Sequence, residues 1–124
     1  MNVENQPAVE EQFHQLDEAL ALSRVGGDSD LLREIVELFL ADYPCTLDKI
    51  RSAVSARDAS AIEQHAHSLK GSVSTFGAEN AFNAALALER QGRMKDLADV
   101  EAGLSQLEGA LGALRPELES IQGR

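Results

Sequence analysis

One short segment of the chain combines a histidine, a lysine and a glycine in a spacing that suits chemistry on a helix surface. His67, Lys70 and Gly71 stand at positions i, i+3 and i+4, which share one side of an α-helix. An imidazole titrates near neutrality, so its neutral form offers a nucleophilic nitrogen at physiological pH. Lys70 can balance a negative group on that ring, and Gly71 removes a side chain where another protein would approach.

The helix that carries these residues also decides which histidine is exposed. Its apolar residues recur every three or four positions and define a buried direction. They are Ile62, Ala66, Leu69, Val73 and Phe76. At about 100° per residue, His67 lies roughly 140° from that direction, and His65 lies about 60° from it on the opposite flank. We therefore expect His67 to be exposed and His65 to lie at the core boundary. Two histidines at i and i+2 face apart, so a metal site is not expected.

The same periodicity predicts two helices before the histidine helix. The first spans residues 13–24 and ends at Gly26-Gly27, since glycine adopts the left-handed cap conformation without strain. The second spans residues 29–57 with Asp28 as its N-cap. Its apolar phase continues across Pro44, which favours one helix kinked near the proline, and two separate helices are the alternative.

The histidine helix and two later helices complete the pattern. Asp58 or Ser60 caps the histidine helix, since Ser60 and Glu63 have the capping-box spacing, and Gly77 ends it. A further helix spans residues 78–91 and ends at Gly92. The last runs over residues 97–121 with a leucine-rich seam typical of a bundle core, and Pro116 is expected to bend or fray its last turns.

Together these segments predict an all-α fold. We expect an antiparallel up-down four-helix bundle, because the links between helices are very short, with the short N-terminal helix as an additional cover. Residues 1–11 have little apolar content and are expected to be a flexible tail, which leaves residues 12–122 as a single domain.

Composition and charge exclude several classes of function. A net charge of −10 without a basic stripe argues against nucleic-acid binding and against contact with an anionic membrane. No apolar run is long enough to span a bilayer. Cys45 is the single cysteine, so no internal disulfide forms, and we expect a reducing, cytoplasmic compartment. Cys45 itself is expected to be a small buried or boundary residue.

At its histidine segment the sequence resembles the histidine-containing phosphotransfer (HPt) domains of bacterial phosphorelays. The core pattern of that family is a histidine followed by lysine at i+3 and glycine at i+4, with a later glycine closing the helix; here these are His67, Lys70, Gly71 and Gly77. The likeness covers residues 13–121 and includes other segments. They are Gly26-Gly27-Asp28, Leu31-Leu32, residues 39–44, Asp58 and Leu88-Glu89.

This resemblance implies a role for each matching residue. HPt domains accept a phosphoryl group on the histidine from an aspartate of a receiver domain and pass it to an aspartate of another receiver. By that likeness His67 is phosphorylated, Lys70 balances the phosphoryl charge, and Gly71 gives steric access. Glu89 matches a position where the family often has a polar residue that orients the imidazole, and Arg90 and Arg93 would rim the docking surface.

The resemblance also implies the partners. It indicates a phosphocarrier that binds no ATP and holds no cofactor, with the Mg²⁺ of the transfer supplied by the receiver. The expected partners are response-regulator receiver domains, a hybrid sensor histidine kinase, or both, and the chain is either free-standing or a domain of such a kinase. A monomer fits a fully satisfied bundle. The alternative is a helical bundle that docks receivers without phosphotransfer.

Overall fold

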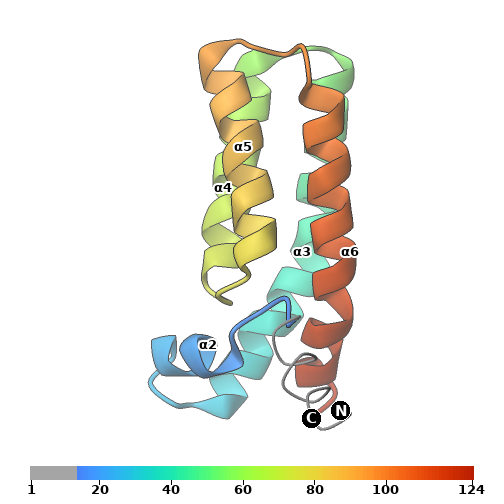
Figure 1. The fold of residues 1–124 in the computed structure, drawn as a ribbon. Helices are drawn as coiled ribbons and strands as arrows, with labels where there is room; N and C mark the ends of the chain where they lie inside the picture. Colours follow the sequence, from blue (N-terminus) through green and yellow to red (C-terminus); the bar gives the residue numbers. More distant parts are fainter. Residues whose placement is uncertain (1–13) are drawn as a thin grey trace, which may run out of the picture.

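The computed structural model describes residues 14–124, and this part of the chain is all-helical with no strand (Figure 1). The helices are α2 (Glu18–Arg24), α3 (Ser29–Ser55), α4 (Ala59–Ser74), α5 (Glu79–Met94) and α6 (Val100–Gln122). The four long helices run alternately up and down, and each packs beside the next, with α6 returning beside α3. The predicted fold class is therefore confirmed. The predicted tail, residues 1–11, lies outside the described residues.

The helices differ in length, and this difference shapes the molecule. The helices α4 and α5 are shorter than α3 and α6. The turn between them lies part-way along the bundle, so the first turns of α3 and the last turns of α6 project beyond it (Figure 1). The helix α2 lies across that projecting end as a cover, and its own residue Ala21 is fully buried. The leucine seam predicted for α6 is core, since Leu107, Leu111, Leu114 and Leu118 are all buried.

The long helix α3 continues through Pro44, so the two-helix alternative is wrong. Asp28 caps α3 as predicted, and its side chain accepts a hydrogen bond from the Leu31 amide at 3.0 Å. Proline removes one donor from the helix, but Tyr43 and Leu47 on either side of it are buried. Packing of that continuous apolar face holds the helix together where intrinsic propensity would break it.

The two ends of α4 refine the prediction. Asp58 rather than Ser60 is the N-cap, with its carboxylate accepting a hydrogen bond from the Ala61 amide at 3.1 Å. The helix ends at Ser74, three residues before the predicted stop at Gly77. Gly77 instead has a φ of +60°, and a Cβ placed there would lie 2.8 Å from the Asp17 Cβ. The glycine therefore serves the close packing of the α2 segment against this turn.

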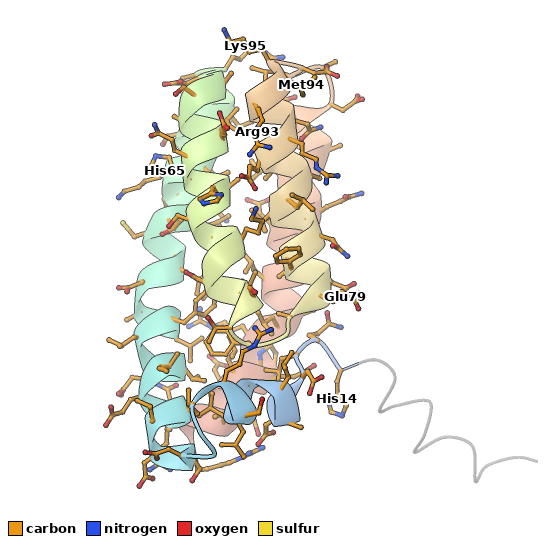
Figure 2. All side chains as sticks on the ribbon, turned by 90° about the vertical axis from the view of Figure 1, so that its left-hand side faces the viewer. His14, His65, Glu79, Arg93, Met94 and Lys95 are labelled. Atoms are coloured by element: carbon orange, nitrogen blue, oxygen red, sulfur yellow. The ribbon has the colours of Figure 1, made fainter. Side chains whose placement is uncertain are left out.

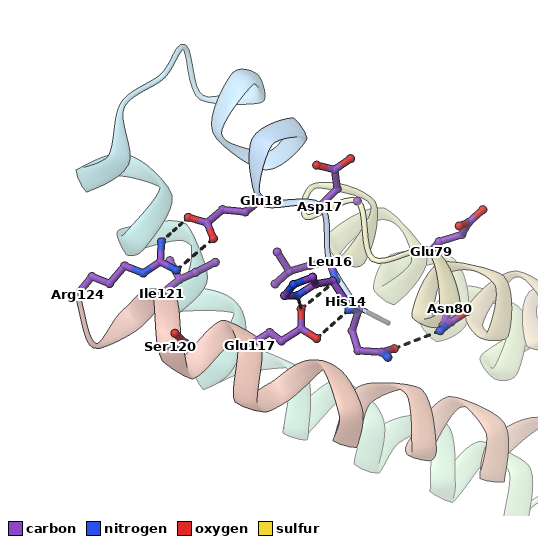
Figure 3. Close-up of a pocket in the computed structure, with 12 residues that line it drawn as sticks. His14, Leu16, Asp17, Glu18, Glu79, Asn80, Glu117, Ser120, Ile121 and Arg124 are labelled. Carbon is purple, nitrogen blue, oxygen red and sulfur yellow. Dashed lines mark hydrogen bonds and ion pairs between the residues drawn. The ribbon is translucent and has the colours of Figure 1, made fainter. Parts of the chain in front are cut away.

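The N-terminal helix begins later than predicted. Phe13 lies outside the described residues, and residues 14–17 are not helical. Their backbone amides are bound elsewhere. Glu117 of α6 accepts hydrogen bonds from Gln15 and Leu16 (Figure 3). The Asp17 amide donates to the Phe76 carbonyl at 3.0 Å. These tertiary partners satisfy donors that a helix would otherwise have to bind, so α2 starts only at Glu18.

The predicted end of α5 at Gly92 is wrong, because the helix continues to Met94 and closes on Lys95 in the left-handed conformation, with φ of +56°. Gly92 is buried inside the helix, and a Cβ there would lie 2.6 Å from the Ala59 carbonyl oxygen and 2.7 Å from the Glu63 amide nitrogen. The missing side chain lets the backbones of α4 and α5 approach each other closely.

The last helix also departs from the prediction at both ends. It begins at Val100 rather than Leu97, and it continues through Pro116 to Gln122. Leu118 and Ile121, beyond the proline, are buried and belong to the hydrophobic core. Tertiary packing therefore keeps these last turns helical, as it does around Pro44.

Candidate functional site

His67 projects from the outer surface of α4, as the helix geometry predicted. Its side chain is 67% exposed, although Ala66 before it is fully buried. His65 is half-buried on the opposite flank of α4, in a shallow groove against α3 (Figure 2). That groove also contains Cys45, which is exposed, so the expectation of a buried or boundary residue is wrong. The two neighbouring histidines thus belong to different faces, and only His67 faces α5.

The buried carboxylate of Glu89 on α5 lies directly behind the imidazole. Glu89 is only 2% exposed, and its Oε2 lies 2.8 Å from His67 Nδ1. Its other oxygen, Oε1, lies 2.7 Å from Lys70 Nζ. The structure therefore brings together His67, Lys70 and Glu89, three of the four residues that the sequence singled out.

Arg93 completes the surroundings of Glu89. Its guanidinium donates through one terminal nitrogen to Glu89 Oε2 at 2.7 Å and through Nε to Glu63 Oε2 at 3.0 Å. The sequence placed Arg93 only on the rim of a docking surface, and Glu63 only in a capping box. The i, i+4 spacing of Glu89 and Arg93 is the signal that points to their pairing.

The cations around Glu89 keep it ionised. Burial alone raises the pKa of a carboxyl group, yet the pKa of Glu89 lies below its ordinary value of 4.5. Lys70 is the largest cause of this lowering, and the hydrogen bond with His67 adds to it against the opposing effect of burial. At neutral pH the group behind His67 is therefore an anion.

An ionised carboxylate fixes the tautomer of the neutral imidazole. A carboxylate only accepts hydrogen bonds, so Nδ1 of His67 carries the hydrogen and donates it to Glu89. Nε2 then carries the lone pair, and no hydrogen-bond partner for it exists within residues 14–124. The geometry presents a nucleophilic nitrogen at an exposed position on α4.

The surface beside His67 is open in two directions. A Cβ placed on Gly71, one turn further along α4, would meet no atom within 4 Å, so the helix presents bare backbone there. On the other side a shallow cavity of about 360 Å³ is lined by Glu63, Gln64, His67, Glu89 and Arg93. A second protein can therefore reach the imidazole without displacing a side chain at Gly71.

Residues 14–124 bring no three His, Cys, Asp or Glu side chains into a group that could hold a metal ion. Across the same part of the chain, no helix has the length and apolar character that crossing a bilayer requires.

An acid titration tests the electrostatics of this site. Because the folded-state pKa of Glu89 is lowered, its ionised form stabilises the fold above the ordinary value of 4.5, and this contribution is lost as the pH falls through the lower folded-state value. The free energy of unfolding of the wild type should therefore exceed that of Glu89→Gln at neutral pH, and the gap should narrow as the pH falls below 4.5. Urea unfolding of both proteins across this range measures it. A gap that stays constant would contradict the lowered pKa.

Two solved structures share this fold. Histidine-containing phosphotransfer protein B (HptB) from Pseudomonas aeruginosa PAO1 is 26% identical, with a TM-score of 0.82 over 89% of this chain and 96% of that chain. The HPT domain of a sensor hybrid histidine kinase from Shewanella is 21% identical, with a TM-score of 0.78 over 89% and 95%, and at that identity it supports the fold alone. The comparison with curated proteins found no significant match.

A family model identifies the chain more directly. The model of the Hpt domain matches residues 34–117, which is more than half of the chain. The matched range contains His67, Lys70, Glu89 and Arg93, the residues that meet at the exposed imidazole. Proteins of this family are phosphocarriers rather than enzymes, and they work with receiver domains and histidine kinases. The chain thus belongs to the Hpt domain family and is a phosphotransfer module of two-component signalling.

Proposed function

We propose that this domain is a phosphorelay intermediate, which accepts a phosphoryl group on His67 from an aspartate of one receiver domain and passes it to an aspartate of another. The arrangement of one imidazole carries this proposal. Nδ1 is held by a buried, ionised carboxylate, and Nε2 is exposed without a partner in the described chain. The domain thus presents a nucleophile supported by Glu89 and Lys70, and the partner supplies the phosphoryl group.

The proposed transfer needs no proton movement on this domain. Nε2 attacks the phosphorus of the receiver's aspartyl phosphate, an N–P bond forms, and the P–O bond to the aspartate breaks so that the aspartate leaves as a carboxylate. The imidazole keeps its Nδ1 hydrogen and becomes positively charged, and the Glu89 carboxylate at 2.8 Å stabilises that charge. In the onward step a carboxylate oxygen of the second receiver attacks phosphorus, and the N–P bond breaks.

Lys70 has the balancing role in this proposal. A phosphoryl group adds roughly 1.5 to 2 negative charges at neutral pH. Lys70 lies one turn from His67 and is only 21% exposed, so its ammonium is held near the ring by Glu89. Its charge is then shared between the buried carboxylate and the phosphoryl group, which limits the repulsion between these two anions.

The partners of the proposed relay follow from the same site. The domain provides the histidine, and the receivers provide the aspartates together with the Mg²⁺ of the transfer. We propose that the domain acts as a monomer in the cytoplasm and binds no ATP. The two similar structures are a phosphotransfer protein and a domain of a hybrid kinase, so their names support either context for this chain.

A labelling experiment tests the proposal against docking alone. The domain is incubated with a receiver domain that carries radioactive aspartyl phosphate, and the products are separated by electrophoresis. Label should move to the domain and should be lost in acid but retained in base, as expected for phosphohistidine. Stable binding of receivers without any label on the domain, tested against the receivers of its own source, would overturn the proposal in favour of the docking module.

Gly71 gives a separate test of steric access. Gly71→Gln should leave the fold intact, because the position is open and glutamine is a better helix former than glycine. The added side chain would stand where the receiver approaches, so the single-turnover rate of transfer should fall by about tenfold or more. Gly109→Gln, at an equally open position of α6, is the matched control and should transfer at the wild-type rate. Equal rates for both variants would remove the steric role.

A further inference from the structure

Four side chains form a connected network between α4 and α5. Glu63 and His67 stand one turn apart on α4, and Glu89 and Arg93 stand one turn apart on α5. Arg93 contacts Glu63 at 3.0 Å and Glu89 at 2.7 Å, and Glu89 contacts His67 at 2.8 Å. Figure 2 shows Arg93 between these two helices. We call these four residues the Glu63–His67 network.

Within this network one oxygen atom accepts hydrogen bonds from two donors. Oε2 of Glu89 accepts hydrogen bonds from both His67 Nδ1 and Arg93, so the guanidinium and the imidazole lie within two hydrogen-bond lengths of each other. Oε1, the other oxygen, faces the Lys70 ammonium. With a cation on each side, the plane of the carboxylate cannot rotate without breaking an ion pair, and Oε2 stays directed at Nδ1.

The orientation of Arg93 is fixed in turn by Glu63. A guanidinium is a planar fork of donors, and here it spans two carboxylates on two different helices. Gly92, next to Arg93, lets the α5 backbone lie against Ala59 and Glu63, which sets the height of Arg93 opposite Glu63. Each member of the network therefore limits the conformational freedom of the next, from Glu63 to the imidazole of His67.

We propose that Arg93 is a positioning residue for the phosphotransfer proposed above, which holds Glu89 in place and through it the Nδ1–H tautomer of His67, and that Glu63 holds Arg93. Arg93 acts through Glu89. The role follows the general rule that the group behind a functional histidine selects which ring nitrogen carries the hydrogen. A surface ion pair without such a role would contribute little and would leave His67 unchanged.

Arg51 provides a matched control elsewhere in the bundle. It also bridges two carboxylates on two helices, with Nε at 2.6 Å from Glu108 of α6 and a terminal nitrogen at 2.8 Å from Asp48 of α3. Its exposure of 48% is close to the 53% of Arg93. Among residues 14–124 neither of its carboxylates pairs with a histidine, so Arg51→Gln removes the same kind of ion-pair bridge without touching the site.

The first readout is the tautomer of the unphosphorylated protein, measured from the ¹⁵N shifts and proton couplings of the His67 ring at a pH where it is neutral. The wild type and Arg51→Gln should show a single Nδ1–H form. Arg93→Gln should show a mixture of both tautomers, and Glu63→Gln a smaller admixture. Arg93→Lys keeps the charge but cannot span both carboxylates, so it should fall between the wild type and Arg93→Gln.

The second readout is the single-turnover transfer rate from a phosphorylated receiver. Loss of a group that orients a metal-ligating histidine typically costs about 10- to 100-fold in activity, and for the comparable role of Arg93 we expect a loss of about tenfold in Arg93→Gln. Arg51→Gln should transfer at the wild-type rate. A single tautomer and a wild-type rate in Arg93→Gln would overturn the positioning role, as would an equal loss in Arg51→Gln. If the wild type accepts no phosphate, the proposed function fails, while the tautomer measurement still decides the role of Arg93.

Discussion

The His67→Gln variant should carry no phosphate after incubation with a phosphorylated receiver domain, under conditions that label the wild type. Glutamine has no nucleophilic ring nitrogen, so no N–P bond can form. Its amide can still donate to the buried Glu89 carboxylate, which leaves the interior of the site paired. Since His67 is 67% exposed, the substitution removes little packing, and the unfolding transition should stay close to that of the wild type.

The neighbouring histidine gives the control for this result. His65 differs from His67 by two positions, and it lies half-buried in the groove against α3. His65→Gln should therefore be labelled like the wild type, because it neither contacts Glu89 nor shares the face of Gly71. Label that survived in His67→Gln would contradict the assignment of His67 as the phosphoryl acceptor. Loss of label in both variants would indicate a docking defect instead.

The Gly92→Ala variant should be the least stable of the single glycine substitutions inside the helices. The new methyl group would lie 2.6 Å from the Ala59 carbonyl oxygen and 2.7 Å from the Glu63 amide nitrogen, and both of these are backbone atoms that no rotamer change can move. The helices α4 and α5 must then separate, and overpacking of this kind typically costs about 1–3 kcal/mol. Separation would also pull Arg93 away from Glu63, so phosphotransfer should fall together with stability.

The matched control is Gly109→Ala, which makes the same chemical change in α6. A Cβ at Gly109 meets nothing within 4 Å, so only the intrinsic preference for helix remains, and this should stabilise the fold by up to about 1 kcal/mol. Urea unfolding monitored by circular dichroism measures both variants. Equal stabilities for the two proteins would mean that α4 and α5 are less closely packed than the structure indicates.

Much of the fold could be predicted because the apolar pattern is nearly continuous. The spacing of apolar residues by three or four positions predicted that α3 continues through Pro44. It also predicted that His67 is exposed and that His65 lies at the core boundary, and the structure agrees on each of these points. Local capping chemistry was equally informative, since Asp28 and Asp58 both cap as short acidic side chains at helix starts commonly do. These signals depend on neighbours in the sequence.

The errors arose where a distant segment decides the local structure. A glycine at the end of an apolar helical pattern often marks the end of a helix. Gly92 instead lies inside α5, where the backbone of α4 leaves no room for a side chain. Residues 14–17 are kept out of a helix by Glu117, which is about a hundred positions away. Likewise the sequence identified Glu89 beside His67, but the link from Glu63 through Arg93 depends on how α4 and α5 are aligned.

The placement of His67 on an open helix face has a consequence for the order of events in a relay. Here the single reactive nitrogen projects from one side of α4, between bare backbone at Gly71 and the rim formed by Arg93. Two receivers that both require this nitrogen must compete for the same footprint. In the proposed relay the donor therefore has to dissociate before the acceptor binds, and the signal passes by turnover of partners rather than through a three-protein assembly.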